Sequence, residues 1–132
     1  MSSNKKEVEM MKLEDFEVYQ LSNELCEELW EIVIKWNYFL KDTIGKQLVR
    51  AADSVSANLS EGYGRFHFKE SLNFAYYSRG SLYETKTWIT KAYKRKLINE
   101  ANYIEFMKKI KNIGVKLNNY ITSIKRRQKQ YK

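Results

Sequence analysis

The residues most suggestive of chemistry lie in the stretch NLSEGYGRFHFKES, residues 58–71. Gly62 and Gly64 precede Arg65, and a Gly-x-Gly-Arg sequence can form a loop whose backbone N–H groups bind phosphate. In nucleotide-binding proteins such a loop joins a strand to a helix, whereas the residues before Gly62 have helical periodicity. No Lys-Ser/Thr pair follows at P-loop spacing. We therefore predict a turn, with Gly62 just past a helix end in the left-handed conformation and Gly64 reversing the chain.

A second chemical possibility concerns the start of the helix that follows this turn. Arg65, His67 and Lys69 lie there, where free backbone N–H groups could help to bind an anion. The chain has one histidine and one cysteine, which excludes an intrachain disulfide and most catalytic triads and zinc sites. The plausible acid–base groups are Glu61, Glu84 and His67, and no activated nucleophile, metal set or cofactor loop accompanies them. We expect no enzymatic activity, no cofactor and no metal.

Composition indicates one globular domain made of long helices. The chain has 132 residues, 43% of them hydrophobic and 30% charged, with five glycines and no proline. The first residues show no apolar core of a signal peptide, and no apolar run approaches the roughly 18 residues of a membrane span. We expect a cytoplasmic protein with no membrane partner.

The charges are unevenly distributed along the chain, whose formal net charge is +8. Acidic residues dominate between Glu7 and Glu31, and none follows Glu105, where nine lysines and arginines occur. Two interpretations stay open: a C-terminal surface that binds polyanions, or a solvated helix face with a frayed basic tail.

Apolar residues recur at steps of three and four over four segments, at about residues 15–37, 43–61, 68–96 and from 99 onward. Thr43 and Asn99 are the expected N-caps of the second and fourth helices. Cys26 lies beside the apolar stripe of the first helix, which favours a packed hydrophobe over a nucleophile. The fourth helix carries a heptad-like seam, typical of antiparallel bundles, at Tyr103, Phe106, Ile110, Ile113, Leu117, Tyr120 and Ile124. We predict a flexible N-terminal segment at 1–13, a four-helix bundle at 14–125 and a basic tail at 126–132.

Polar side chains line one edge of the second helix, namely Arg50, Ser54, Asn58 and Glu61. We predict that this polar stripe meets Glu84 and the small residues of the third helix, within or between subunits, with Arg50 and Glu84 in a bidentate contact. Replacing Arg50 by alanine should then weaken folding or assembly. The alternative is that these residues shape the bundle and bind nothing else. Gly80, in the middle of the third helix, suggests a close approach by another helix there.

Two sequence motifs resemble those of a known family. RAADSVSANLSEGYGR, residues 50–65, and RGSLYE, residues 79–84, are similar to the bacterial 23S rRNA intervening-sequence proteins, also called the four-helix-bundle protein family. The resemblance spans roughly residues 16–124. Members often have Phe-Pro in the first loop, where this chain has NYFLKDTIGKQ without proline, so the resemblance implies the fold but not the shape of that loop.

The resemblance implies an all-α fold, an antiparallel up-down four-helix bundle that assembles into a ring-like homopentamer. It also implies distant similarity to the accessory proteins of diversity-generating retroelements, which are pentameric and bind nucleic acid. No enzymatic activity comes with it. The residues point separately toward self-association, because the apolar faces of the first and third helices are wider than a monomer of this size needs to bury.

We therefore expect a non-enzymatic homo-oligomer that binds nucleic acid, RNA over DNA, through basic surface residues. The candidate contacts are Arg65, Lys69, Lys108, Lys111, Lys125, Arg126 and Arg127. The alternative is a scaffold with a protein partner, docked on the acidic first helix or in a groove of the bundle.

Overall fold

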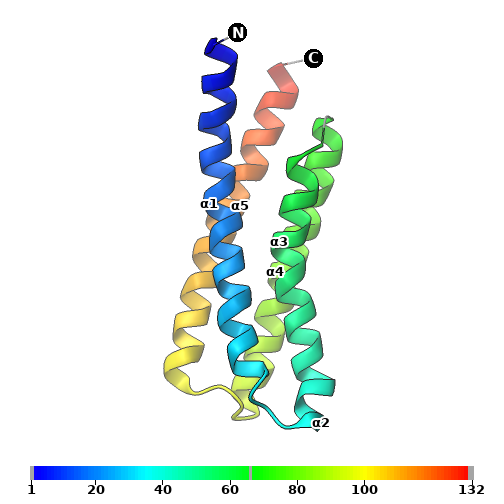
Figure 1. Cartoon of the computed structure of the whole chain (residues 1–132), viewed down its shortest axis with the longest axis vertical. Coiled ribbons are helices and arrows are strands. Elements are labelled where there is room, and N and C mark those ends of the chain that lie inside the picture. The colour runs from blue at the N-terminus through cyan, green and yellow to red at the C-terminus, as the bar shows by residue number, and fades with distance from the viewer. Residues whose placement is uncertain (1, 66, 131–132) are drawn as a thin grey trace.

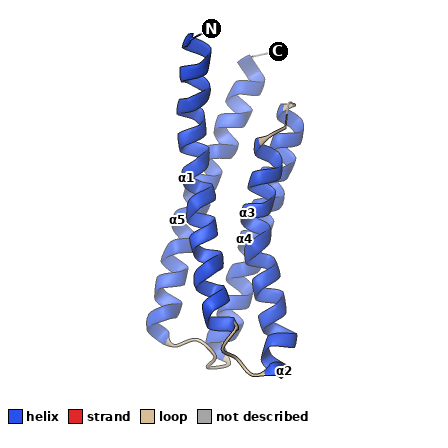
Figure 2. Cartoon of the chain, viewed as in Figure 1, coloured by secondary structure: helices blue, strands red, loops and turns tan. Residues whose placement is uncertain are grey.

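The computed structural model describes the chain at residues 2–65 and 67–130, with side chains from Glu17 onward. Its helices are α1 (Ser2–Val33), α2 (Tyr38–Leu40), the π-helical turn η1 (Lys41–Gly45), α3 (Lys46–Tyr63), α4 (Phe68–Lys94) and α5 (Glu100–Gln130). The described residues contain no strand (Figure 2). The prediction of an all-α protein is confirmed.

Four long helices lie side by side in this structure (Figure 1). α1 packs against α3 and α5, and α4 packs against the same two helices. The start of α1, the end of α5 and the α3–α4 connection lie at one end of the molecule. The connections from α1 to α2 and from α4 to α5 lie at the other end, so consecutive long helices run in opposite directions.

The core forms along the predicted apolar stripes. The apolar stripe of the predicted second helix lies in η1 and α3, and its residues are all buried: Ile44, Leu48, Ala51, Val55 and Leu59. The seam of α5 is buried too, except for half-buried Tyr103, which stacks on Tyr93 of α4 with ring centroids 4.2 Å apart. Small polar residues let α4 approach α3 closely, since buried Ser78 donates a hydrogen bond of 2.7 Å to the Val55 carbonyl.

Cys26 is a packed core residue, as its position in the stripe predicts. Its Sγ donates to the Ala52 carbonyl of α3 at 3.0 Å. Burial, with a smaller contribution from the Asp53 carboxylate, raises the pKa of the Cys26 thiol to about 12. The group therefore stays a neutral thiol at neutral pH and is a poor nucleophile.

The first connection differs from the prediction, in which the first helix extended to about Asn37 and Thr43 capped the second. α1 ends at Val33, and the Asn37 side chain caps α2 by accepting a hydrogen bond from the Leu40 N–H at 3.0 Å. Thr43 lies inside η1, where its hydroxyl donates to the Phe39 carbonyl at 2.7 Å. The prediction for Thr43 is wrong because helical backbone already begins at Tyr38, ahead of Ile44, the first residue of the apolar stripe. The predicted N-cap of the last helix is confirmed, since the Asn99 side chain accepts from the Asn102 N–H at 2.7 Å.

The first and last helices of the chain are longer than predicted. α1 begins at Ser2 rather than near Asp15, and α5 reaches Gln130. Residues 2–33 contain neither proline nor glycine, so nothing in the sequence breaks the helix before the first apolar residue of the stripe. Helical backbone thus continues across the predicted boundaries at residues 14 and 125. The division into segment, bundle and tail stays a prediction.

Gly62 and Gly80 have the opposite roles to those predicted. Gly62 is not past a helix end in a left-handed conformation, because it lies inside α3 and no glycine among the described residues has positive φ. It is buried, and a Cβ there would lie 2.6 Å from Cβ of Phe74 in α4. A Cβ on Gly80 would meet nothing within 4 Å, so no helix approaches it among the described residues of the chain. The close helix approach occurs at Gly62.

Candidate nucleic-acid interface

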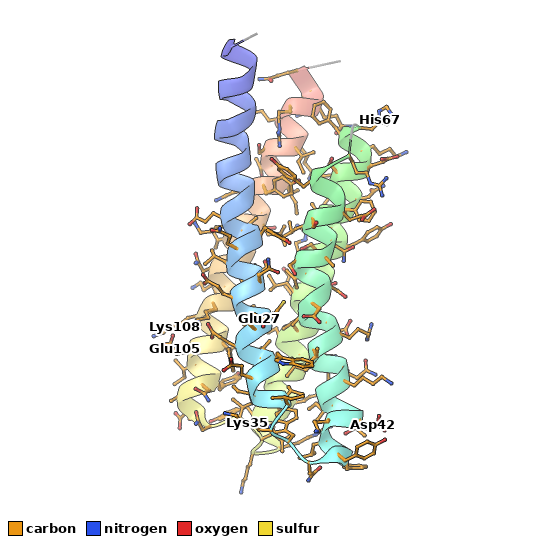
Figure 3. The ribbon with its side chains drawn as sticks, in the orientation of Figure 1. Glu27, Lys35, Asp42, His67, Glu105 and Lys108 are labelled. Carbon is orange, nitrogen blue, oxygen red and sulfur yellow. The ribbon has the colours of Figure 1, made fainter. Side chains whose placement is uncertain are left out.

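The candidate cations predicted from the sequence fall into separate places. Arg65 forms an ion pair with Glu61 and lies over the Phe74 ring, 5.1 Å from its centroid. Lys108 lies 3.8 Å from the Glu105 carboxylate on its own helix, as the neighbouring labels in Figure 3 indicate. These two cations are therefore partly neutralised by carboxylates.

The end of α5, which carries the basic residues, lies at the same end of the molecule as the α3–α4 connection, where Figure 3 labels His67. Lys69 and Arg126 are exposed. The Lys125 ammonium lies 5.7 Å from the centroid of the Tyr76 ring, and Arg127 Nε donates to the Ser123 carbonyl at 3.3 Å. At this end of the molecule, some of the predicted cations are thus open to solvent, whereas others contact neighbouring groups of the protein.

A more continuous basic surface lies on α4, where the sequence interpretation placed no contact after Lys69. Lys86, Lys91, Lys94 and Arg95 line a shallow hollow of about 490 Å³ together with Thr87 and Thr90. Both threonine hydroxyls donate hydrogen bonds to backbone carbonyls one turn earlier in α4. The three ammonium groups and the guanidinium group are the charged groups of the lining. No carboxylate lines this hollow in the part of the chain that the structure describes.

A groove of about 500 Å³ between α4 and α5 continues this surface. Lys86 lines both the hollow and the groove, and Arg79 of α4 and Lys111 of α5 add two further cations to the groove. The described lining of the groove contains no acidic residue either. We call the combined set the α4–α5 basic surface; it consists of Arg79, Lys86, Lys91, Lys94, Arg95 and Lys111.

The packing of α1 explains why these cations keep their charge unpaired. Lysines on the other side of α5 face the acidic helix α1: Lys109 pairs with Glu28, and Lys116 lies 3.1 Å from Glu17. Among described residues, none of the six cations of the α4–α5 basic surface is in an ion pair. Two have neutral partners: Arg79 lies over Tyr76 and donates a hydrogen bond of 3.1 Å to Asn118 Oδ1 of α5, and Lys91 lies over Trp88. The positive charge of the chain is therefore exposed on the side away from α1.

The sequence does contain a signal for this surface. Residues 85–99 hold five lysines and arginines and no acidic residue. Aromatic and threonine residues interrupt the run, so it is less conspicuous than the basic tail. Of the predicted contacts, only Lys111 belongs to the α4–α5 basic surface.

The polar stripe of α3 makes its contacts within one chain. Arg50 Nη2 lies 3.1 Å from Glu84 Oε2, and the same oxygen accepts from Trp88 Nε1 at 3.0 Å. This is one nitrogen–oxygen contact rather than the bidentate pair expected. Ser54 and Asn58 donate to carbonyls of their own helix. Among the described residues, Arg50 is thus the member of the stripe that joins α3 to α4 by an ion pair.

Replacing Arg50 by alanine should have a small effect on the monomer. The side chains of Arg50 and Glu84 are 60% and 40% exposed, and an ion pair this accessible contributes at most about 1 kcal/mol. We expect the melting temperature to fall by a few degrees, measured by circular dichroism, with no change of mass in light scattering. A change of mass would mean that Arg50 also contacts a second subunit.

Comparison with known proteins identifies the relationship. Residues 14–119 match the family model described as 23S rRNA-intervening sequence protein. The chain belongs to this family. The match includes both motifs on which the resemblance was based, and it extends over all four long helices.

A solved structure has the same fold. It is the 1.70 Å crystal structure of a protein with unknown function from the S23 ribosomal protein family of Bacteroides thetaiotaomicron VPI-5482. The two chains are 19% identical, with a TM-score of 0.74 over 83% of this chain and 98% of the other. A search of curated proteins found no match. No helix within the described residues is long and apolar enough to cross a membrane.

Proposed function

We propose that this member of the 23S rRNA-intervening sequence protein family is a non-enzymatic RNA-binding protein whose contact surface is the α4–α5 basic surface. The observation that carries the proposal is the set of six cations, unopposed by any carboxylate, on two adjacent helices. From Arg79 to Arg95 the set extends along roughly 24 Å of α4. A surface of this length can follow a phosphate backbone, and contact with phosphates would release counterions and drive binding.

Self-association would strengthen such binding. Large apolar side chains are exposed where α1 meets α2: Trp30 is 49%, Ile34 46%, Tyr38 78% and Phe39 71% accessible. Burying them against another copy would remove apolar area from water. We propose a ring-like homopentamer of antiparallel bundles, distantly similar to the accessory proteins of diversity-generating retroelements and acting in the bacterial cytoplasm. Five copies of one weak basic surface would bind a single RNA with greater avidity.

The same apolar residues favour a second candidate function, a scaffold with a protein partner and no role in RNA binding. A partner that covers Trp30 and Ile34 would dock beside the acidic face of α1 and away from the α4–α5 basic surface. Nuclease treatment separates the two candidates, because a protein partner would be retained after the RNA is removed.

The test of the proposal is a salt series. Purified, nuclease-treated protein is titrated into fluorescein-labelled single-stranded RNA, duplex RNA and duplex DNA of equal length, and binding is followed by anisotropy. For four to six phosphate contacts, the slope of log affinity against log salt should be about −3 to −4 on single strands. Light scattering on the same sample gives the number of subunits. Absence of RNA binding at about 50 mM salt would contradict the proposal and favour the scaffold.

A further inference from the structure

We propose that the groove between α4 and α5 holds an unpaired base of single-stranded RNA, stacked on the ring of Tyr83. This rests on the proposed function and goes further, because it names the form of nucleic acid that the surface selects. In this arrangement the phosphates on either side of the base contact Arg79, Lys86 and Lys111.

The periodicity of both helices builds the groove. Arg79, Leu82, Tyr83 and Lys86 are spaced by three and four residues, so they share the edge of α4 that faces α5. The facing edge of α5 has the same spacing, at Met107, Ile110, Lys111, Gly114, Val115 and Asn118. Leucine, isoleucine and methionine form an apolar floor, and the cations lie around it. Such a combination suits a nucleic-acid base, whose flat ring packs on apolar side chains while the phosphates on either side of it contact the cations.

Gly114 gives the groove part of its depth. A Cβ at this position would lie 3.7 Å from Leu82 Cδ2, an ordinary van der Waals contact. The backbone therefore has room for a side chain that the sequence does not supply. The absence of that side chain leaves space beside Leu82, in the groove that Tyr83 also lines.

Tyr83 is the aromatic ring in this region that remains open to a ligand. Its side chain is 63% exposed and makes no ring contact with another described residue. Tyr76 is covered by Arg79 and Lys125, and Tyr93 is stacked on Tyr103. An exposed tyrosine between two cations on one helix edge is poorly placed for the core, and it matches the stacking sites of proteins that bind single strands.

The base that enters this groove must be unpaired. In a duplex both faces of every base are stacked and its edge is paired, so stacking on Tyr83 would first require melting of the helix. Duplex RNA can still contact the six cations with its phosphates. The inference therefore predicts that removing the ring affects single strands alone.

The experiment compares Tyr83→Ser with the matched control Tyr77→Ser in the full-length protein. Tyr77 is also an exposed tyrosine of α4, 59% accessible, and it does not line the groove. The probes are a labelled oligouridine of about 12 nucleotides and a duplex of the same length. Tyr83→Ser should weaken oligouridine binding about tenfold and leave both duplex binding and the salt slope unchanged, because it removes one stacking contact and no charge. Tyr77→Ser should leave both affinities unchanged.

A second variant tests the groove without touching the aromatic ring. Gly114→Leu fills the space over the floor and should also weaken oligouridine binding relative to the duplex, with its folding checked by circular dichroism. If wild-type protein binds both RNAs with a steep salt slope and Tyr83→Ser binds oligouridine equally well, the stacking inference is wrong and the α4–α5 basic surface stands. If wild-type protein binds neither RNA, the proposed function is wrong, and the inference with it.

Discussion

Replacing Lys86, Lys94 and Arg95 together by glutamine should lower the affinity for single-stranded RNA about 100-fold at roughly 0.1 M salt. All three line the basic hollow on α4, and each is exposed. Each phosphate contact on a single strand contributes about 0.7 to the slope of log affinity against log salt, so the slope should become shallower by about 2. Anisotropy across a salt series measures both quantities.

The matched control is the triple glutamine variant of Lys125, Arg126 and Arg127. It removes the same amount of charge from the end of α5, whose residues the sequence alone predicted as RNA contacts. Lys125 lies over Tyr76 and Arg127 is bonded to the Ser123 carbonyl, so we expect a clearly smaller loss of affinity. Equal losses in the two variants would mean that net charge governs binding, and the assignment of the contact surface to α4 and α5 would fail.

The second large effect concerns Gly62 in α3 and Gly80 in α4. Gly62→Ala should destabilise the protein by about 1–3 kcal/mol, since the new Cβ would lie 2.6 Å from Phe74 Cβ and 3.3 Å from the Ser71 carbonyl. The helices would have to separate, which would also disturb the 2.9 Å hydrogen bond from the Ser71 hydroxyl to the Gly62 carbonyl.

Gly80→Ala is the matched control for this prediction. A Cβ there meets nothing within 4 Å, and alanine favours the helix over glycine by about 0.5–1 kcal/mol. Urea unfolding of both variants should therefore give changes of opposite sign. A stable Gly62→Ala would contradict the close approach of α3 and α4. A destabilised Gly80→Ala would show that another chain packs against this part of α4.

The sequence alone was sufficient to predict the long helices and most of the buried core residues. Steps of three and four place one stripe of each helix against its neighbours whatever the partner is, so Leu48, Val55 and Ile113 could be predicted as buried. Cap residues beside a clear stripe are also local signals. Asn99 was therefore predicted correctly, whereas Thr43 was misplaced because the chain becomes helical at Tyr38, before its stripe begins.

Only the tertiary structure decided which glycine lies at a helix contact and which cations remain unpaired. Gly62 and Gly80 are both glycines in helices, and nothing local reveals that Phe74 lies against the first and nothing against the second. In the same way, Lys109, Lys111 and Lys116 are near neighbours on one helix. Two of them pair with carboxylates of α1, and Lys111 lies in the groove beside α4. Helical periodicity determines which residues share a face, whereas the charge of that face depends on which helix packs beside it.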